Sequence, residues 1–125
     1  MLYSIQVSGR LDGLNEYTKA NRSNRYAGAN MKKKNEGKVI SAIRAAGLEG
    51  KRIKPPVRIT IDWYEPNRRR DLDNIAFAKK FILDGIVKAG LLDNDNWEFV
   101  EGFIDYFYID KANPRIEIVI EELER

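Results

Sequence analysis

Residues 57–64 read VRITIDWY, and this alternation of apolar and polar side chains is the clearest strand signal in the chain. Successive side chains of a strand point to opposite faces, so the four apolar residues share one face. They are Val57, Ile59, Ile61 and Trp63. Pro66 ends the run, because proline donates no hydrogen bond to a sheet. The stretch therefore predicts a strand with one buried face.

The segment after this strand is expected to be a helix. Asp73 or Asn74 is a suitable N-cap, and Gly90 is a suitable end because glycine readily adopts the left-handed conformation found there. Apolar residues recur between them on one side at helical spacing. They are Ile75, Ala78, Ile82, Ile86 and Ala89.

The remaining segments complete a mixed fold. Residues 2–7 suit a first strand, and residues 13–47 favour a long helix that breaks near residues 22–24. Residues 99–109 and 115–120 read as two strands, and the turn-like segment between them suggests a hairpin. This order predicts a small α/β (α+β) domain with a mixed four-stranded sheet and helices packed on one face.

Composition excludes several kinds of chemistry. The chain has 125 residues, which suits a single domain over residues 1–125, and it contains neither cysteine nor histidine. Disulfides, thiolate zinc sites and Ser-His-Asp catalysis are therefore impossible. Catalysis must rest on carboxylates, lysine, tyrosine or a bound metal ion.

Charge points to a polyanionic partner. The net charge is only +3, but basic residues gather at residues 22–25, 32–34, 51–54 and 68–70. Such clusters favour phosphate backbones, because neutralised phosphates release counterions. No apolar run approaches the roughly 20 residues of a membrane-spanning helix, and the first residues lack the features of a signal peptide. We expect a cytoplasmic protein that does not associate with membranes.

Residues 68–74 read RRRDLDN and join three arginines to two carboxylates. In an extended segment Asp71 and Asp73 project to the same face, and Leu72 points the other way into the core. Neighbouring carboxylates repel each other unless a cation neutralises them, and Mg²⁺ prefers carboxylate, water and phosphate oxygens. The two acids therefore form a candidate metal-binding site.

A third acid is available in the sequence DNDN at residues 93–96. Asp95, or else Asp93, would complete the ligand set if the chain after Gly90 returns to the end of the sheet that carries Asp71 and Asp73. The alternative is that these acids have ordinary roles, since Asp-x-Asp-Asn also caps helices and DNDN has the composition of a surface turn. An EF-hand is excluded, because Glu98 stands where that loop needs glycine.

Basic side chains near the acids suit phosphate binding. Lys80 lies two helical turns beyond Asp73 on about the same face, where it could stabilise charge on a phosphate; alternatively it pairs with Asp84 on a solvated helix face. Guanidinium groups bind phosphate bidentately, so at least one of the three arginines would hold the phosphate backbone that flanks the metal site, unless they form only a solvated charge run. These arginines are Arg68, Arg69 and Arg70.

Aromatic residues near the C-terminus suggest burial on both faces of one strand. Phe99, Phe103 and Phe107 share one face, and Tyr106 and Tyr108 share the other. One face would meet the helices. The other would meet a second subunit in a homodimer, or else be partly covered by the N-terminal segment.

The motifs together resemble the RusA family of Holliday junction resolvases, which are small, often prophage-encoded endonucleases that act as Mg²⁺-dependent homodimers. The resemblance is carried by RRRDLDN at residues 68–74, LDGIVKAG at residues 83–90 and DND at residues 93–95, and it is strongest over residues 57–120. Nearer the N-terminus, NRSNRY at residues 21–26 is loosely similar to the Asn/Arg/Tyr-rich segment of the family.

The resemblance also implies roles for single residues. The implied metal-binding catalytic acids are Asp71, Asp73 and Asp95. A catalytic lysine is implied as well. If its position is counted forward from Asp71, that position holds Phe77. If it is counted back from Gly90, the position holds Lys80, as though about one helical turn had been inserted after Asn74. Lys80 is therefore favoured as the catalytic lysine, and Lys79 is the alternative. If Lys79 is not catalytic, it is expected to contact DNA.

The resulting hypothesis is an Mg²⁺-dependent endodeoxyribonuclease, with Mn²⁺ as a substitute ion, that resolves four-way junction DNA by paired incisions during recombination and repair. One alternative is a related metal nuclease that acts on flaps, forks or RNA. The other is a DNA-binding recombination accessory protein without catalytic activity, in which the acids are structural.

Overall fold

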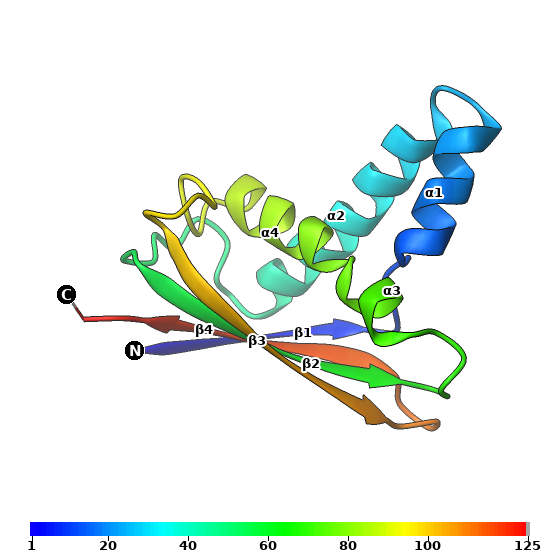
Figure 1. The fold of residues 1–125 in the computed structure, drawn as a ribbon. Helices are drawn as coiled ribbons and strands as arrows, with labels where there is room; N and C mark the ends of the chain where they lie inside the picture. The colour runs from blue at the N-terminus through cyan, green and yellow to red at the C-terminus, as the bar shows by residue number, and fades with distance from the viewer. Residues whose placement is uncertain (125) are drawn as a thin grey trace.

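The predicted central strand forms as β2 in the computed structural model, which describes residues 1–124 (Figure 1). It lies inside a four-stranded sheet of order β1-β4-β2-β3. The strands are β1 (Leu2–Ser8), β2 (Val57–Glu65), β3 (Val100–Ile109) and β4 (Arg115–Glu122). β4 runs antiparallel to β1 and β2, whereas β3 runs parallel to β2. The predicted mixed four-stranded sheet is confirmed.

The predicted hairpin between the last two strands is wrong. β3 and β4 are consecutive in the chain, but β2 lies between them. Residues 110–114 therefore pass across the end of β2, where the N–H of Asp110 donates to the carbonyl oxygen of Glu65 at 2.8 Å. Turn residues signal a reversal of direction but do not specify the neighbouring strand. As a result, β3 forms one edge of the sheet.

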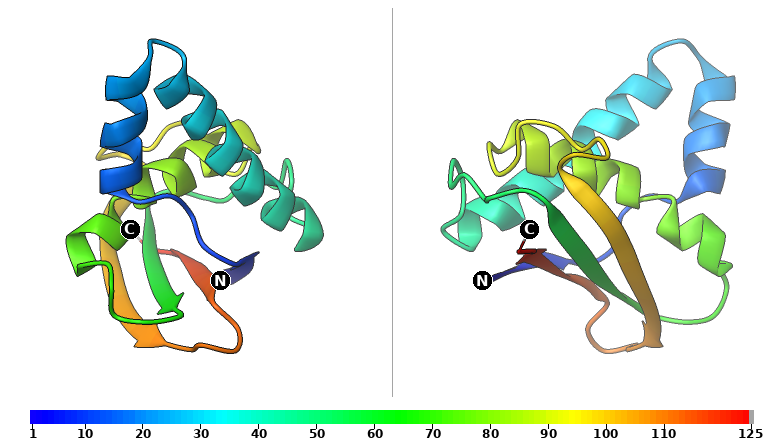
Figure 2. Two further views of the ribbon diagram at one scale, coloured as in Figure 1. Left: turned by 90° about the vertical axis from the view of Figure 1, so that its right-hand side faces the viewer. Right: turned by 60° about the vertical axis from the view of Figure 1, so that its left-hand side comes forward.

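Helices cover one side of the sheet, as predicted (Figure 2). They are α1 (Leu14–Ser23), α2 (Ala27–Ala45), α3 (Leu72–Ala76) and α4 (Lys79–Lys88). The break between α1 and α2 falls at Asn24, whose side chain accepts hydrogen bonds from the N–H groups of Tyr26 and Ala27. The single helix predicted after β2 is divided into α3 and α4. At the break, the N–H groups of Ala78 and Lys80 donate to the carbonyl oxygens three residues earlier, and not to those four residues earlier as in an α-helix. Within residues 1–124, no helix has the length and apolar character needed to cross a membrane.

The core lies between the sheet and the pair α2 and α4. Ile59, Ile61 and Trp63 of β2 are at most 1% exposed and belong to one cluster with apolar residues of both helices. Gly85 of α4 allows the two helices to approach closely. A Cβ atom at this position would lie 2.7 Å from Cγ1 of Val39 on α2.

The opposite side of the sheet is open (Figures 1 and 2). Tyr106 and Tyr108 of β3 face this side and are 51% and 44% exposed. The N-terminal segment does not cover them, because β1 joins the sheet and α1 and α2 lie on the same side as α4. That alternative is therefore wrong, and contact with a second subunit stays a prediction.

Two helical glycines allow a matched test of this packing. Gly85→Ala should lower the free energy of unfolding by about 1–3 kcal/mol, because the added methyl group overlaps Val39. Gly37→Ala, inside α2 with no neighbour within 4 Å, should raise it by about 0.5–1 kcal/mol, since alanine favours helix. Urea denaturation measures both changes. A stabilised Gly85→Ala protein would contradict the close approach.

Candidate functional site

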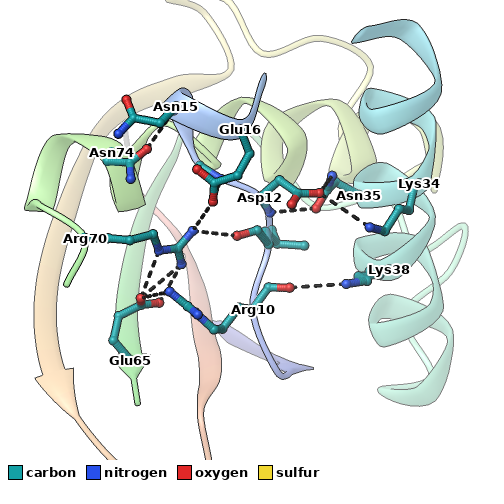
Figure 3. Close-up of polar contacts among 12 residues, drawn as sticks. Arg10, Asp12, Asn15, Glu16, Lys34, Asn35, Lys38, Glu65, Arg70 and Asn74 are labelled. Atoms are coloured by element: carbon teal, nitrogen blue, oxygen red, sulfur yellow. Dashed lines mark hydrogen bonds and ion pairs between the residues drawn. The ribbon is translucent and has the colours of Figure 1, made fainter. Parts of the chain in front are cut away.

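A buried ion pair fixes the segment that carries the RRRDLDN motif (Figure 3). Glu65, the last residue of β2, is only 4% exposed. Arg70 donates to it through Nε and Nη2 at 2.9 to 3.1 Å, and Arg10 adds a hydrogen bond at 2.9 Å. The second terminal nitrogen of Arg70 donates to the carbonyl oxygen of Leu11 at 3.1 Å and to Glu16 at 3.2 Å. One guanidinium group thus joins the end of β2 to the β1–α1 connection and to α1.

The last residue of the motif attaches α1 to α3. Asn74 is 7% exposed, and its Oδ1 accepts a hydrogen bond from the N–H of Asn15 in the first turn of α1. Gly13 is required beside it, because a Cβ atom there would lie 2.6 Å from both the carbonyl oxygen and Oδ1 of Asn74. Asp73 or Asn74 was expected to cap the helix after β2, but the N-cap there is Asp71. Asn74 instead caps α1, which is distant in the sequence.

Asp71 and Asp73 both face solvent at the start of α3. Asp71 is the N-cap residue, with an extended backbone, and Asp73 lies in the first helical turn. The expectation that Leu72 points into the core is wrong, since Leu72 is 57% exposed. The chain becomes helical at Leu72, so Ile75 on the next turn is buried instead. The two carboxylates nevertheless lie close in sequence on an exposed turn that the Arg70 network holds in place.

A pocket of about 450 Å³ adjoins Asp71 at this end of the sheet. Arg68 and Asp71 contribute polar lining, and Leu72, Ile75 and Ile109 contribute apolar lining. The pocket therefore extends from Asp71 to the end of the edge strand β3.

The segment between α4 and β3, which contains Asp95, lies at the opposite end of the sheet from α3 (Figure 1). Asp95 lines a hollow together with Val100 and Gly102 at the start of β3. β3 has ten residues and so spans roughly 30 Å before it reaches the pocket beside Asp71. Among residues 1–124, no group of three acidic side chains is arranged to hold a metal ion. In a single chain, the residues after Gly90 do not return to the first two acids.

Asp93 and Asp95 differ in their surroundings. Asp93 forms an ion pair with Arg52, with an Nη2 to Oδ1 distance of 2.6 Å. In the part of the chain that the structure describes, Asp95 makes no ion pair. Its carboxylate is therefore the more available of the two for a ligand.

The basic residues predicted for the site fall into two groups. Arg68, Arg69 and Lys80 are exposed. The side chain of Arg70 is only 12% exposed and is bound as described above. Lys79 donates to Asp105 of β3 at 2.6 Å and lies over the ring of Phe103, 4.6 Å from its centroid. The exposed group can reach a phosphate without breaking existing contacts, whereas Arg70 and Lys79 cannot.

The open side of the sheet is poorly suited to a phosphate backbone. Asp62 lies directly opposite Glu117, and burial, followed by the Glu117 charge, raises the pKa of Asp62. Arg115 is hydrogen-bonded to both Glu117 and Asp110, and its hydrogen bond lowers the pKa of Asp110. The positive charge on this side is thus balanced by neighbouring carboxylates.

The position of Glu65 in the sequence is a signal for the ion-pair network. Glu65 continues the period-two pattern of β2, two residues after Trp63, and so falls on the core face. A carboxylate there needs a cationic partner, because an unpaired charge is strongly disfavoured in a protein interior. Arg10, which binds Glu65, and Glu16, which binds Arg70, come from distant segments and could not be identified in this way.

Comparison with known proteins gives one match and one negative result. A family model described as endodeoxyribonuclease RusA matches residues 14–121 of the chain. This range includes the RRRDLDN motif, the acidic turn and strands β2, β3 and most of β4. No curated protein matches the chain.

The Arg70 network leads to a stability prediction. Arg70→Ala should lower the free energy of unfolding by about 3–5 kcal/mol, because it removes the main partner of the buried Glu65. Arg69→Ala, at the adjacent exposed position, should change it by less than about 0.5 kcal/mol. Equilibrium denaturation compares the two variants. Equal effects would show that the ion pair does not anchor the loop.

Proposed function

Because the chain belongs to the RusA family of endodeoxyribonucleases, we propose that it resolves Holliday junctions by paired, Mg²⁺-dependent incisions. Membership makes the chain a hydrolase that cleaves DNA, and resolution of Holliday junctions is the activity associated with the family. The observation that carries the proposal is the exposed pair Asp71 and Asp73, held by the Arg70 network beside the exposed Arg68 and Arg69.

Asp71 and Asp73 suit a divalent cation in their chemistry and exposure. Mg²⁺ is commonly bound by one or two carboxylates together with water and substrate phosphate. Neither acid forms an ion pair within residues 1–124, so both carboxylates are available. A bound Mg²⁺ or Mn²⁺ would stabilise negative charge on the phosphate and lower the pKa of a water ligand.

The third acid, Asp95, is proposed to come from a second copy of the chain. β3 is an edge strand whose start lies beside Asp95 and whose end lies beside Asp71. Antiparallel pairing of β3 with the same strand of a second copy, about a twofold axis at its middle, brings the start of one strand to the end of the other. Asp95 of the second copy then approaches Asp71 and Asp73. The homodimer would contain two such sites, related by symmetry, which suits incision of two opposed strands.

The proposed roles of the basic residues follow from their exposure. Arg68 and Arg69 would bind phosphates beside the acids, since their guanidinium groups face solvent. Lys80 would support charge on the reacting phosphate or donate a proton to the leaving oxygen. Arg70 and Lys79 would instead position the motif and the edge strand, because Glu65 and Asp105 already bind them.

Cleavage assays on defined substrates test the activity. With Mg²⁺, the protein should make paired cuts in a four-way junction, and EDTA should abolish them. Asp73→Asn should reduce cleavage more than about 100-fold, since even residues that only support metal ligands are worth 10–100-fold. Junction binding should be preserved. Asp93→Asn is the matched control and should remain active, because Asp93 is bound to Arg52.

The substrate comparison separates the alternatives. Faster cutting of flaps, forks or RNA than of junctions would favour a related nuclease of different specificity. Absence of any metal-dependent cleavage would favour an accessory DNA-binding role.

A mixing experiment tests whether each site uses two chains. Asp73→Asn and Asp95→Asn proteins should each be inactive alone. After subunit exchange, each mixed dimer would contain one intact site and one doubly altered site. An equimolar mixture should therefore regain about a quarter of the wild-type sites and should nick junctions without making paired cuts. Continued inactivity, with mixed dimers detected by native mass spectrometry, would place all three acids of a site in one chain.

A further inference from the structure

Trp97 is an unusual surface residue. Its side chain is 97% exposed in the turn that carries Asp95, although tryptophan has a large apolar surface. The other tryptophan, Trp63, is 1% exposed in the core. Because tryptophan is enriched at protein interfaces, a fully exposed tryptophan next to a candidate metal ligand suggests a contact that the isolated chain does not make.

A matching concave surface lies at the other end of the same sheet. The pocket of about 450 Å³ beside Asp71 has apolar walls at Leu72, Ile75 and Ile109. Leu72 and Ile109 are 57% and 50% exposed, so the chain itself leaves much of this lining uncovered. Its volume is sufficient to accommodate an indole side chain.

We propose that Trp97 of each chain inserts into this pocket of a second copy. The inference rests on the homodimer of the proposed function and adds the contact that holds it together. Antiparallel pairing of β3 brings the Trp97 turn of one copy to the end of β3 in the other, where the pocket lies. Twofold symmetry then produces the contact twice, with both copies contributing the same surfaces.

Charge favours a second copy over DNA as the partner of Trp97. Residues 93–98 contain Asp93, Asp95 and Glu98 and no lysine or arginine. This acidic turn would repel a phosphate backbone in the absence of a cation. The charged lining of the pocket consists of the ion-paired Arg70 and Glu65, together with Arg68 and Asp71. Arg68 and the adjacent Arg69 are exposed, so a second copy offers the acidic turn a cationic neighbour that DNA lacks.

The insertion would link assembly to the site of cleavage. Trp97 is two residues from Asp95, and the pocket includes Asp71 in its lining. An indole held in the pocket therefore fixes Asp95 near the acids of the second copy. Trp97 acts in this scheme as a positioning residue that makes no contact with the reacting phosphate.

Sedimentation of single and double variants tests the contact. Trp97→Ala should raise the dimer dissociation constant at least about tenfold, as expected for a buried aromatic anchor. Leu72→Ala, at an exposed pocket residue, should also raise it. The double variant should show less than the product of the two effects, because both remove the same contact. Strictly multiplicative effects, or an unchanged dimer in Trp97→Ala, would overturn the proposal.

Fluorescence provides a second readout in the wild-type protein. Dilution from dimer to monomer should increase quenching by acrylamide, since Trp63 is buried and Trp97 would become exposed. Trp97→Phe should still dimerise but should lose this change. Quenching that does not depend on protein concentration, while sedimentation reports dissociation, would overturn the proposal.

Activity distinguishes this inference from the proposed function. Trp97→Ala should lose cleavage at low protein concentration and regain it when concentration restores the dimer. A variant that stays dimeric but binds junctions weakly would assign Trp97 to DNA stacking and overturn the contact. If the wild-type protein cleaves none of the substrates but forms a dimer that Trp97→Ala dissociates, the proposed function fails and the Trp97 contact remains supported.

Discussion

The salt bridge between Glu65 and Arg70 is the constraint on which the arrangement of the acids depends. A carboxylate at the end of a buried strand loses most of its hydration, and only a well-placed cation with several hydrogen bonds compensates for that loss. Arg70 meets this requirement with two nitrogens and uses the third to bind the β1–α1 connection and α1. Because Arg70 and Asp71 are adjacent, the same contact determines where the motif leaves the sheet.

Three consecutive arginines thus have different roles despite their identical chemistry. Arg70 is enclosed and bound, whereas Arg68 and Arg69 face solvent beside the acids. The same division separates Lys79 from Lys80, since Lys79 is held by Asp105 and Lys80 is exposed. In both cases the bound residue fixes backbone geometry and its neighbour keeps its charge available.

Much of the fold could be predicted because it depends on local periodicity. The alternation through Trp63 identified β2, and the interruption near Asn24 separated α1 from α2. Strand order depends instead on contacts between distant segments, so the turn before Arg115 wrongly suggested a hairpin. The same limit applied to the site. The motif at Asp71 and Asp73 was evident, but the position of Asp95 depends on β3 running parallel to β2, which no local pattern specifies.

The exposed edge of β3 also has a consequence for handling the protein. Strand edges in stable monomers are usually blunted by lysine, proline or a covering segment. Residues 100–109 contain neither lysine nor proline, and they carry large apolar side chains on both faces. Chains in which no partner covers this edge would thus be prone to aggregate through it during expression or refolding. A lysine introduced near Ile104 would place a charge on this edge and so oppose aggregation of unpaired chains.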